Sequence, residues 1–182
     1  MDNISVYYTD GAALPSQTLL LYSAALYSGE SSDSFTVVRD SGKKPYFASH
    51  PNIHFSVSHS GSFWAVAFAN DEVGLDIQFS SEKISQERVA KRYFHPREYE
   101  AYCNGTDFYD IWVRKEAVCK LYGVGIDKSF AQTDTYSGYF GLQRFFLKDI
   151  LLKSDIIPHG AIAYGRDFVY NINKLQITEV LL

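Results

Sequence analysis

The segment from Phe108 to Lys120 constrains this chain more than any other, because its pattern fits one kind of secondary structure. It reads FYDIWVRKEAVCK and predicts a helix with Trp112, Glu116 and Lys120 in one stripe along a flank. An aromatic ring, an acid and a base are an unusual set of residues for a core. The same set can hold a metal ion together with an anion, so this flank is a candidate functional surface.

A second constraint is a carboxylate within the apolar segment Val73–Ile77, which predicts a strand. A buried Asp76 is costly unless a positive group or hydrogen-bond donors meet it. Backbone amides would suffice for Asp76 alone, and an ion pair with Lys120 would explain Glu116 alone. A divalent cation shared by Asp76 and Glu116 explains both. Carboxylate ligands favour Mg²⁺ or Mn²⁺, ions that keep waters and bind substrate phosphates.

The composition is that of a globular protein with one or two small domains. The 182 residues are 46% hydrophobic, which allows a sizeable core, and the net charge of −4 argues against a nucleic-acid-binding protein. The first 80 residues hold three of the 17 basic residues: Arg39, Lys43 and Lys44. Cys103 and Cys119 lack metal-ligand spacing, and no run approaches the length of a membrane span. We therefore expect a cytoplasmic protein that is not in a membrane.

Hydrophobic periodicity predicts an α+β protein in two parts, with residues 1–80 and 81–182 joined by a polar linker. The first part is predicted to contain a strand at Ile4–Tyr8, a helix at Pro15–Tyr27, a strand at Phe35–Val38, and an antiparallel meander of 53–57, Phe63–Ala69 and Val73–Ile77. The second part is predicted to contain helices at Ile84–Phe94, Arg97–Tyr102 and Asp107–Tyr122, then strands at Gly138–Leu147, Gly160–Tyr164, Phe168–Ile172 and Lys174–Glu179.

Two segments predict where an anion would bind. Ser58–Gly61 is expected to follow a strand, and it reads either as a serine turn with a structural histidine or as a phosphate cradle. Lys43–Pro45 reads either as a solvated loop or as a positively charged flap over a nucleotide. Lys115 and Lys120 add two cations. Together with a metal, these donors favour a substrate with a pyrophosphate and a metal-assisted displacement at phosphorus.

Several of these segments together resemble the 4′-phosphopantetheinyl transferases, most closely the surfactin-type branch, a monomeric form with two subdomains. The segments that carry the resemblance are Lys44-Pro45, Phe55–Gly61, Val73–Ile77, Arg92–Glu98 and Trp112–Gly125. It covers about residues 42–130, and its specific part is the Trp–Lys–Glu–Lys helix combined with the Gly-x-Asp strand. The resemblance implies the fold of that family, in which two similar α+β subdomains have a pseudo-twofold arrangement.

The resemblance also implies an activity. Enzymes of this family use Mg²⁺ to transfer the phosphopantetheine arm of coenzyme A to a serine of an acyl or peptidyl carrier protein, in fatty acid or secondary metabolite biosynthesis. The other product is adenosine 3′,5′-bisphosphate. The implied metal ligands are Asp76 and Glu116, which with Lys120 are also the implied catalytic residues. The implied coenzyme A-binding residues are Lys43, Lys44, Pro45, Ser58, His59, Lys115 and Lys120.

Two departures from the family pattern bear on the site. Gln78 stands where the family usually has an acid two residues after the strand Asp. Its amide oxygen is a third candidate metal ligand, but one negative charge is gone. Residues 1–38 contain no Lys or Arg, whereas the branch often has basic residues there that grip the 3′-phosphate. Lys43, at a position where the family often has glycine, is the expected substitute.

Two other functions fit part of the pattern. A non-catalytic module that binds coenzyme A or a carrier protein would explain Gln78 and the missing basic residues. A metal-dependent nuclease would use Asp76, Glu116 and Lys120, but such cores place the acid and lysine two residues apart on a strand. A carrier protein, which tends to be acidic, is expected to dock on a basic face formed by Lys83, Arg88, Lys91, Arg92 and Arg97.

Overall fold

The computed structural model describes residues 1–11, 14–81, 85–126, 128–154 and 157–176. The helices are α1 (Ser16–Ser28), η1 (a 3₁₀ turn, Ser32–Ser34), α2 (Gln86–Tyr93), α3 (Pro96–Cys103), α4 (Phe108–Tyr122) and α5 (Lys128–Gln132). The strands are β1 (Asp2–Thr9), β2 (Val37–Val38), β3 (Tyr46–Phe47), β4 (His54–Ser60), β5 (Phe63–Ala69), β6 (Val73–Gln78), β7 (Tyr139–Phe140), β8 (Gln143–Arg144), β9 (Phe146–Asp149), β10 (His159–Tyr164) and β11 (Phe168–Lys174). The fold class is α+β, as predicted.

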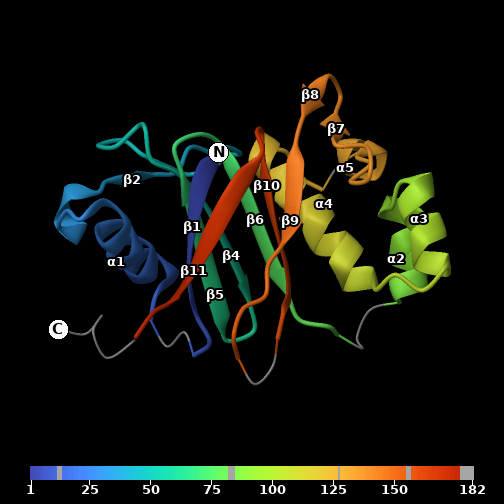
Figure 1. The fold of residues 1–182 in the computed structure, drawn as a ribbon, viewed down its shortest axis with the longest axis horizontal. Helices are drawn as coiled ribbons and strands as arrows, with labels where there is room; N and C mark the ends of the chain where they lie inside the picture. Colours follow the sequence, from blue (N-terminus) through green and yellow to red (C-terminus); the bar gives the residue numbers. More distant parts are fainter. Residues whose placement is uncertain (12–13, 82–84, 127, 155–156, 177–182) are drawn as a thin grey trace.

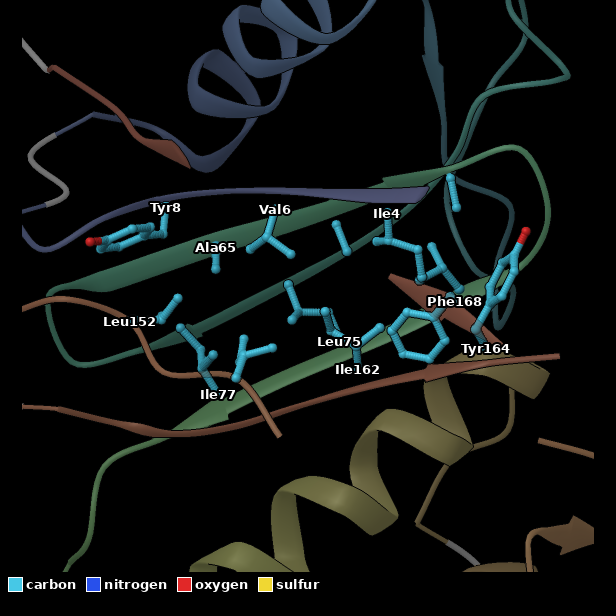
Figure 2. Close-up of a cluster of buried hydrophobic side chains, with 14 of the residues drawn as sticks. Ile4, Val6, Tyr8, Ala65, Leu75, Ile77, Leu152, Ile162, Tyr164 and Phe168 are labelled. Atoms are coloured by element: carbon cyan, nitrogen blue, oxygen red, sulfur yellow. The ribbon is translucent and has the colours of Figure 1, made fainter. Parts of the chain in front are cut away.

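Two main sheets occupy the centre of the molecule (Figure 1). The first has the order β11-β1-β5-β4 and is antiparallel except for the parallel pair of β1 and β11. The second has the order β6-β10-β9 and is antiparallel throughout. Helix α1 lies beside the first sheet and α4 lies against the second. The apolar core between the sheets includes Ile4, Val6, Leu75, Ile77 and Ile162 (Figure 2).

The predicted meander is wrong at its third strand. Strands β4 and β5 pair as expected, but β6 pairs with β10. The hydroxyls of Ser56, Ser58 and Ser60 on β4 accept hydrogen bonds from the backbone amides of residues 75, 77 and 79. Side chains therefore take the place of a backbone ladder between β4 and β6. This polar seam joins the two sheets beside β6.

Each main sheet combines strands from both halves of the sequence. Strand β11, near the end of the chain, extends the first sheet, whereas β6, from the first 80 residues, is part of the second. The predicted boundary near residue 80 therefore does not coincide with the boundary between the sheets. The division into two subdomains in a pseudo-twofold arrangement stays a prediction.

Most predicted elements are present within a few residues of their predicted ends. The predicted strand Gly138–Leu147 is instead a hairpin followed by β9, because Gly138 and Gly141 adopt positive φ angles of 73° and 59° that turn the chain. Ile84 of the predicted helix Ile84–Phe94 lies outside the described residues, as do residues 177–179 of the predicted strand Lys174–Glu179. In the part of the chain that the structure describes, no helix has the length and apolarity needed to cross a bilayer.

Candidate active site

A glycine lets helix α4 lie directly on strand β6. A Cβ atom at Gly74 would be 1.8 Å from the carbonyl oxygen of Ala117 and 2.6 Å from the amide nitrogen of Leu121, both in α4. Real Cβ contacts are never that short, so only glycine allows this approach. Because successive side chains of a strand point to opposite faces, Asp76 lies on the same face of β6 as Gly74. The close packing therefore brings Asp76 next to Glu116 and Lys120 on α4.

Asp76 is 6% exposed and meets a positive group, as its burial requires. Its Oδ1 atom accepts hydrogen bonds from the Lys120 ammonium and the Ser58 hydroxyl, each at 2.7 Å. Lys120 also reaches the carbonyl oxygen of Val57 at 3.5 Å. Lys120 thus ties α4 to both β4 and β6 at this point.

Asp76, Glu116 and Lys120 line one small cavity of about 190 Å³, which we call the carboxylate pocket. Its other lining residues are Val57, Ser58, His59, Gln78 and Trp112. The structure thus brings together all three predicted catalytic residues and all three predicted metal ligands. His59 is exposed at this pocket, whereas Trp112 packs on Phe108 and Phe130.

Burial and the neighbouring carboxylate of Asp76 raise the pKa of Glu116 from 4.5 to about 7, and Lys120 opposes this rise. The main cause is desolvation, which penalises the charged form. Both carboxylates line the same pocket, and the repulsion by Asp76 contributes to the raised pKa of Glu116. A divalent cation between them would remove this repulsion, so the donor set fits such an ion.

The raised pKa of Glu116 predicts that the metal-free protein becomes less stable as the pH rises from about 4.5 to 7. The folded state keeps the Glu116 proton up to about pH 7, whereas the unfolded chain releases it near its ordinary value. The stabilisation is complete below the unfolded pKa and is lost through this window, by roughly 2–3 kcal/mol. Urea unfolding with a chelator present, at pH 5 and pH 8, measures it.

The matched variants for this measurement are Glu116→Gln and Glu100→Gln. Glu116→Gln removes the titrating group, so the part of the stability loss due to Glu116 should vanish. Glu100 is exposed on α3 and its replacement should leave the pH dependence of the parent protein intact. A pH dependence that is the same in Glu116→Gln and in the parent protein would show that Glu116 does not titrate in this range.

A larger cavity of about 390 Å³ opens beside the carboxylate pocket and shares Val57 and Lys120 with it. We call it the cation pocket, because Arg39, Lys43 and Lys44 all line it. These are all the basic residues of the first 80. Pro45, Phe55 and the Gly123–Gly125 turn supply apolar and backbone surface. Sequence reasoning missed Arg39, although its place among so few basic residues was a signal.

Lys43 and Lys44 differ in how readily their ammonium groups can reach a ligand in the cation pocket. The Lys44 ammonium lies 2.6 Å from both Oε2 of Glu72 and the carbonyl oxygen of Val73. Burial lowers the pKa of Lys44, and Glu72 opposes that shift. The Lys43 side chain is 74% exposed and its ammonium lies 3.9 Å from Asp40. Lys43 can therefore reach a ligand, whereas Lys44 offers mainly its stem and backbone.

The expectation that Lys115 binds coenzyme A is corrected by its position. Lys115 is fully buried, and its ammonium lies 2.7 Å from Glu98 and 2.6 Å from the carbonyl oxygen of Thr133. Glu98 also accepts hydrogen bonds from the amide and hydroxyl of Thr135. Lys115 thus ties α3 and the Thr133–Thr135 segment to α4. It lines neither the carboxylate pocket nor the cation pocket.

The serine–histidine segment also differs from its predicted form. Strand β4 runs through to Ser60, so Ser58 lies in the strand and not in a turn. The Ser58 hydroxyl bonds to Asp76 and to the amide of Ile77. Its role as a phosphate donor is therefore not supported by its contacts, although it does line the carboxylate pocket.

A third group of possible ligand atoms lies near the start of α4. Asp107, Asp110 and His159 offer atoms within 4.8 Å of one another. Asp107 caps the helix by accepting from the amide of Tyr109 at 2.7 Å, and Asp110 lies 2.6 Å from His159. Capping and pairing account for this cluster. This cluster could not be predicted from the sequence, because His159 is far from the two acids along the chain.

Comparison with known proteins finds a family to which part of this chain is similar. Residues 72–152 match the model of the 4′-phosphopantetheinyl transferase superfamily. The chain is 37% identical over 89 residues to 4′-phosphopantetheinyl transferase Sfp of Bacillus subtilis, covering 46% of this chain and 39% of that protein. It is 32% identical over 100 residues to 4′-phosphopantetheinyl transferase gsp of Aneurinibacillus migulanus, covering 47% and 41%.

A putative 4′-phosphopantetheinyl transferase of Haemophilus influenzae is 32% identical over 121 residues, 60% of this chain and 50% of that protein. In the first of these alignments the chain spans about two fifths of the relative's length, 39%. The family model starts just before Asp76 and includes Glu116 and Lys120, so it covers the carboxylates that line the smaller pocket. The matched parts of the chain are thus similar to 4′-phosphopantetheinyl transferases, among them Sfp of Bacillus subtilis.

Proposed function

We propose that this protein transfers the 4′-phosphopantetheine arm of coenzyme A to a serine of an acyl or peptidyl carrier protein. It would act as a monomer and release adenosine 3′,5′-bisphosphate. One observation carries the proposal: the pocket that contains Asp76, Glu116 and Lys120 adjoins a pocket lined by Lys120 and three further basic residues. This pair of pockets suits a ligand with a diphosphate at one end and a phosphorylated nucleoside at the other.

The carboxylate pocket would hold a divalent cation through Asp76 and Glu116, with the Gln78 amide oxygen as a neutral third ligand. The buried Asp76 and the repulsion that raises the pKa of Glu116 support this assignment. Three protein ligands would leave the remaining coordination positions of the ion to waters and phosphate oxygens. This is the usual arrangement at Mg²⁺ and Mn²⁺ sites. When bound, the ion would polarise the diphosphate of coenzyme A and screen its negative charge.

Lys120 and His59 would stabilise the negative charge that develops on the phosphate oxygens. Lys120 lines both pockets, so its ammonium is at the junction where a diphosphate would lie. His59 is exposed and also lines the carboxylate pocket. Positioned cations of this kind act mainly by electrostatic stabilisation of the transition state.

Glu116, directly or through a water, would take the proton of the carrier serine. With a divalent cation bound beside it, Glu116 would be held in its carboxylate form, and a carboxylate can accept a proton directly or through a positioned water. The serine oxygen then forms a bond to the β-phosphorus of coenzyme A. The bond from that phosphorus to the bridging oxygen breaks, and adenosine 3′,5′-bisphosphate leaves with that oxygen.

Intact-mass spectrometry tests the proposal. The protein is incubated with coenzyme A, Mg²⁺ and several apo carrier proteins of fatty acid, polyketide and peptide synthesis, with and without a chelator. We expect at least one carrier to gain the mass of phosphopantetheine, and the gain to stop with chelator. Coenzyme A binding without any gain, in Mg²⁺ or Mn²⁺, would instead favour the non-catalytic binding module.

The cation pocket predicts that Arg39 and Lys43 hold the 3′-phosphate of coenzyme A, in place of the basic residues that 1–38 lack. Arg39→Ala and Lys43→Ala should each raise the KM for coenzyme A by about 10-fold, because a charge-assisted hydrogen bond contributes about 1.5–3 kcal/mol. The value of kcat should change little. Initial rates at varied coenzyme A measure both parameters.

Two comparisons control this measurement. Lys153→Ala removes an exposed cation outside both pockets and should leave the KM unchanged. Coenzyme A without its 3′-phosphate should be used equally well by the parent protein and by the variants of Arg39 and Lys43. Variants that discriminate between the two forms of coenzyme A as strongly as the parent protein would contradict the assignment.

The basic face on α2 is the proposed docking surface for an acidic carrier protein. Arg88, Lys91 and Arg92 are exposed there, whereas Arg97 on α3 pairs with Asp134 at 2.8 Å. Lys83, the fifth predicted residue of the face, lies outside the described residues. The exposed charges of α2 remain available for long-range attraction, which acts mainly on the association rate.

Charge reversal tests this surface. The double variant Arg88→Glu, Arg92→Glu should slow transfer by about 10-fold at low salt and make the rate less sensitive to salt. Coenzyme A binding should not change, because α2 residues line neither pocket. Rates measured at two salt concentrations, beside a Lys153→Glu control, decide the matter. Equal low-salt rates for the double variant and the parent protein would rule out α2 as the docking surface.

A further inference from the structure

Three serines on one edge of β4 make the same type of contact with β6, but one of them does more. The hydroxyls of Ser56, Ser58 and Ser60 accept from the amides of residues 75, 77 and 79 at 3.0, 3.2 and 3.0 Å. Ser58 also donates to Oδ1 of Asp76 at 2.7 Å. All three serines are buried, at 4%, 5% and 8% exposure, so water does not compete readily for these bonds.

The Ser58 hydroxyl has a fixed orientation because of these two contacts. A hydroxyl has one proton, and the amide of Ile77 already supplies the proton for its own bond to Ser58. The Ser58 proton is therefore left for Asp76. The second donor to the same oxygen of Asp76 is Lys120, also at 2.7 Å. Within the described residues, the hydrogen bonds of this carboxylate all reach Oδ1, which leaves Oδ2 for a ligand in the carboxylate pocket.

We propose that Ser58 is a positioning residue, whose hydroxyl fixes the rotation of the Asp76 carboxylate so that Oδ2 is presented to a divalent cation. The inference rests on the metal site of the proposed function. Groups that orient a ligating side chain without touching the metal commonly change metal affinity by about 10- to 100-fold. Ser58 thus acts through Asp76, not on a phosphate of the substrate.

Mn²⁺ binding in the absence of coenzyme A and carrier protein tests this role, by calorimetry and by the electron paramagnetic resonance signal of free Mn²⁺. Ser58→Ala should weaken Mn²⁺ binding by about 10-fold or more. Ser56→Ala and Ser60→Ala are matched controls, because each removes one bond to a β6 amide without touching Asp76. They should bind Mn²⁺ within about twofold of the parent protein. Ser58→Thr keeps the hydroxyl and should restore most of the affinity.

Thermal unfolding separates this effect from a general loss of structure. All three alanine variants lose one bond from a backbone amide, and Ser58→Ala also loses its bond to Asp76, so its melting temperature should fall somewhat more than those of the two controls. Only Ser58→Ala should lose Mn²⁺ affinity while it remains folded at the temperature of the binding measurement. If Ser58→Ala does not fold, Ser58→Cys keeps the size of the side chain with a weaker donor, and should show an intermediate loss.

The outcomes distinguish this inference from the proposed function. A parent protein that binds Mn²⁺, with Ser58→Ala or Ser58→Cys binding as tightly as the Ser56→Ala control, would overturn the role of Ser58 and leave the metal site standing. A parent protein that does not bind Mn²⁺ at all would overturn the metal site, and with it this inference. Weaker binding in Ser58→Ala alone, restored in Ser58→Thr, would support it.

Discussion

Gly74→Ala is expected to cost about 3 kcal/mol of stability or more, and to leave little folded protein. The added Cβ would lie 1.8 Å from a backbone oxygen of α4 and 2.6 Å from a backbone nitrogen. Neither atom belongs to a flexible side chain, so the whole helix would have to move away from β6. Such a shift would also separate Asp76 from Glu116 and Lys120. Urea and thermal unfolding of the variant measure the loss.

Alanine substitutions at two other glycines serve as comparisons for this prediction. At Gly160 the added Cβ would lie 2.6 Å from the Cγ1 atom of the buried Ile150, a side-chain atom and not backbone, so Gly160→Ala should cost less than Gly74→Ala. At Gly165 no atom lies within 4 Å, so Gly165→Ala should be nearly neutral. Stability losses that do not follow the order Gly74, Gly160, Gly165 would mean that α4 is not packed on β6 as described.

Asp76→Asn and Glu116→Gln are each expected to slow transfer by at least about 1,000-fold. Each change keeps the size of the side chain and removes one of the two negative charges that face each other in the carboxylate pocket. The affinity for coenzyme A should fall less than 10-fold, roughly, because the cation pocket is intact in both variants. Initial transfer rates and equilibrium coenzyme A binding, measured on the same preparations, separate the two effects.

Much of this site could be predicted from the sequence, because the residues that form it repeat at the periods of a helix and a strand. Glu116 and Lys120 are neighbours on any helix, and Asp76 shares a strand face with Gly74. What joins the two elements is the missing Cβ of Gly74. A glycine two residues from a buried acid indicates a close approach of backbone, but it does not say which helix approaches.

The prediction that Lys115 binds coenzyme A rested on its place in the motif alone. Lys115 precedes Glu116 by one position on the helix, so about 100° of rotation separates their side chains and the two point in different directions. Helical geometry alone therefore indicated that the side chain of Lys115 lies in different surroundings from that of Glu116. Its partner, Glu98, could not be named from the sequence, because the pairing depends on how α3 packs against α4.

The pairing of β6 could not be predicted from the sequence, for a different reason. Short connections between β4, β5 and β6 are typical of a meander, and the local pattern contains nothing against it. The seam between β4 and β6 depends on serine hydroxyls replacing backbone groups, and β6 instead pairs with β10, which lies in the last quarter of the chain. Long-range pairing of this kind is decided by packing of the whole molecule, not by local pattern.

The most direct test of the account is the rate at which an apo carrier protein gains phosphopantetheine mass with the parent protein, with Asp76→Asn, with Glu116→Gln, and with Glu100→Gln as a surface control. The account predicts Mg²⁺-dependent transfer by the parent protein and by Glu100→Gln, and transfer reduced at least about 1,000-fold in both pocket variants although they still bind coenzyme A. Pocket variants that transfer at the rate of the parent protein would contradict it.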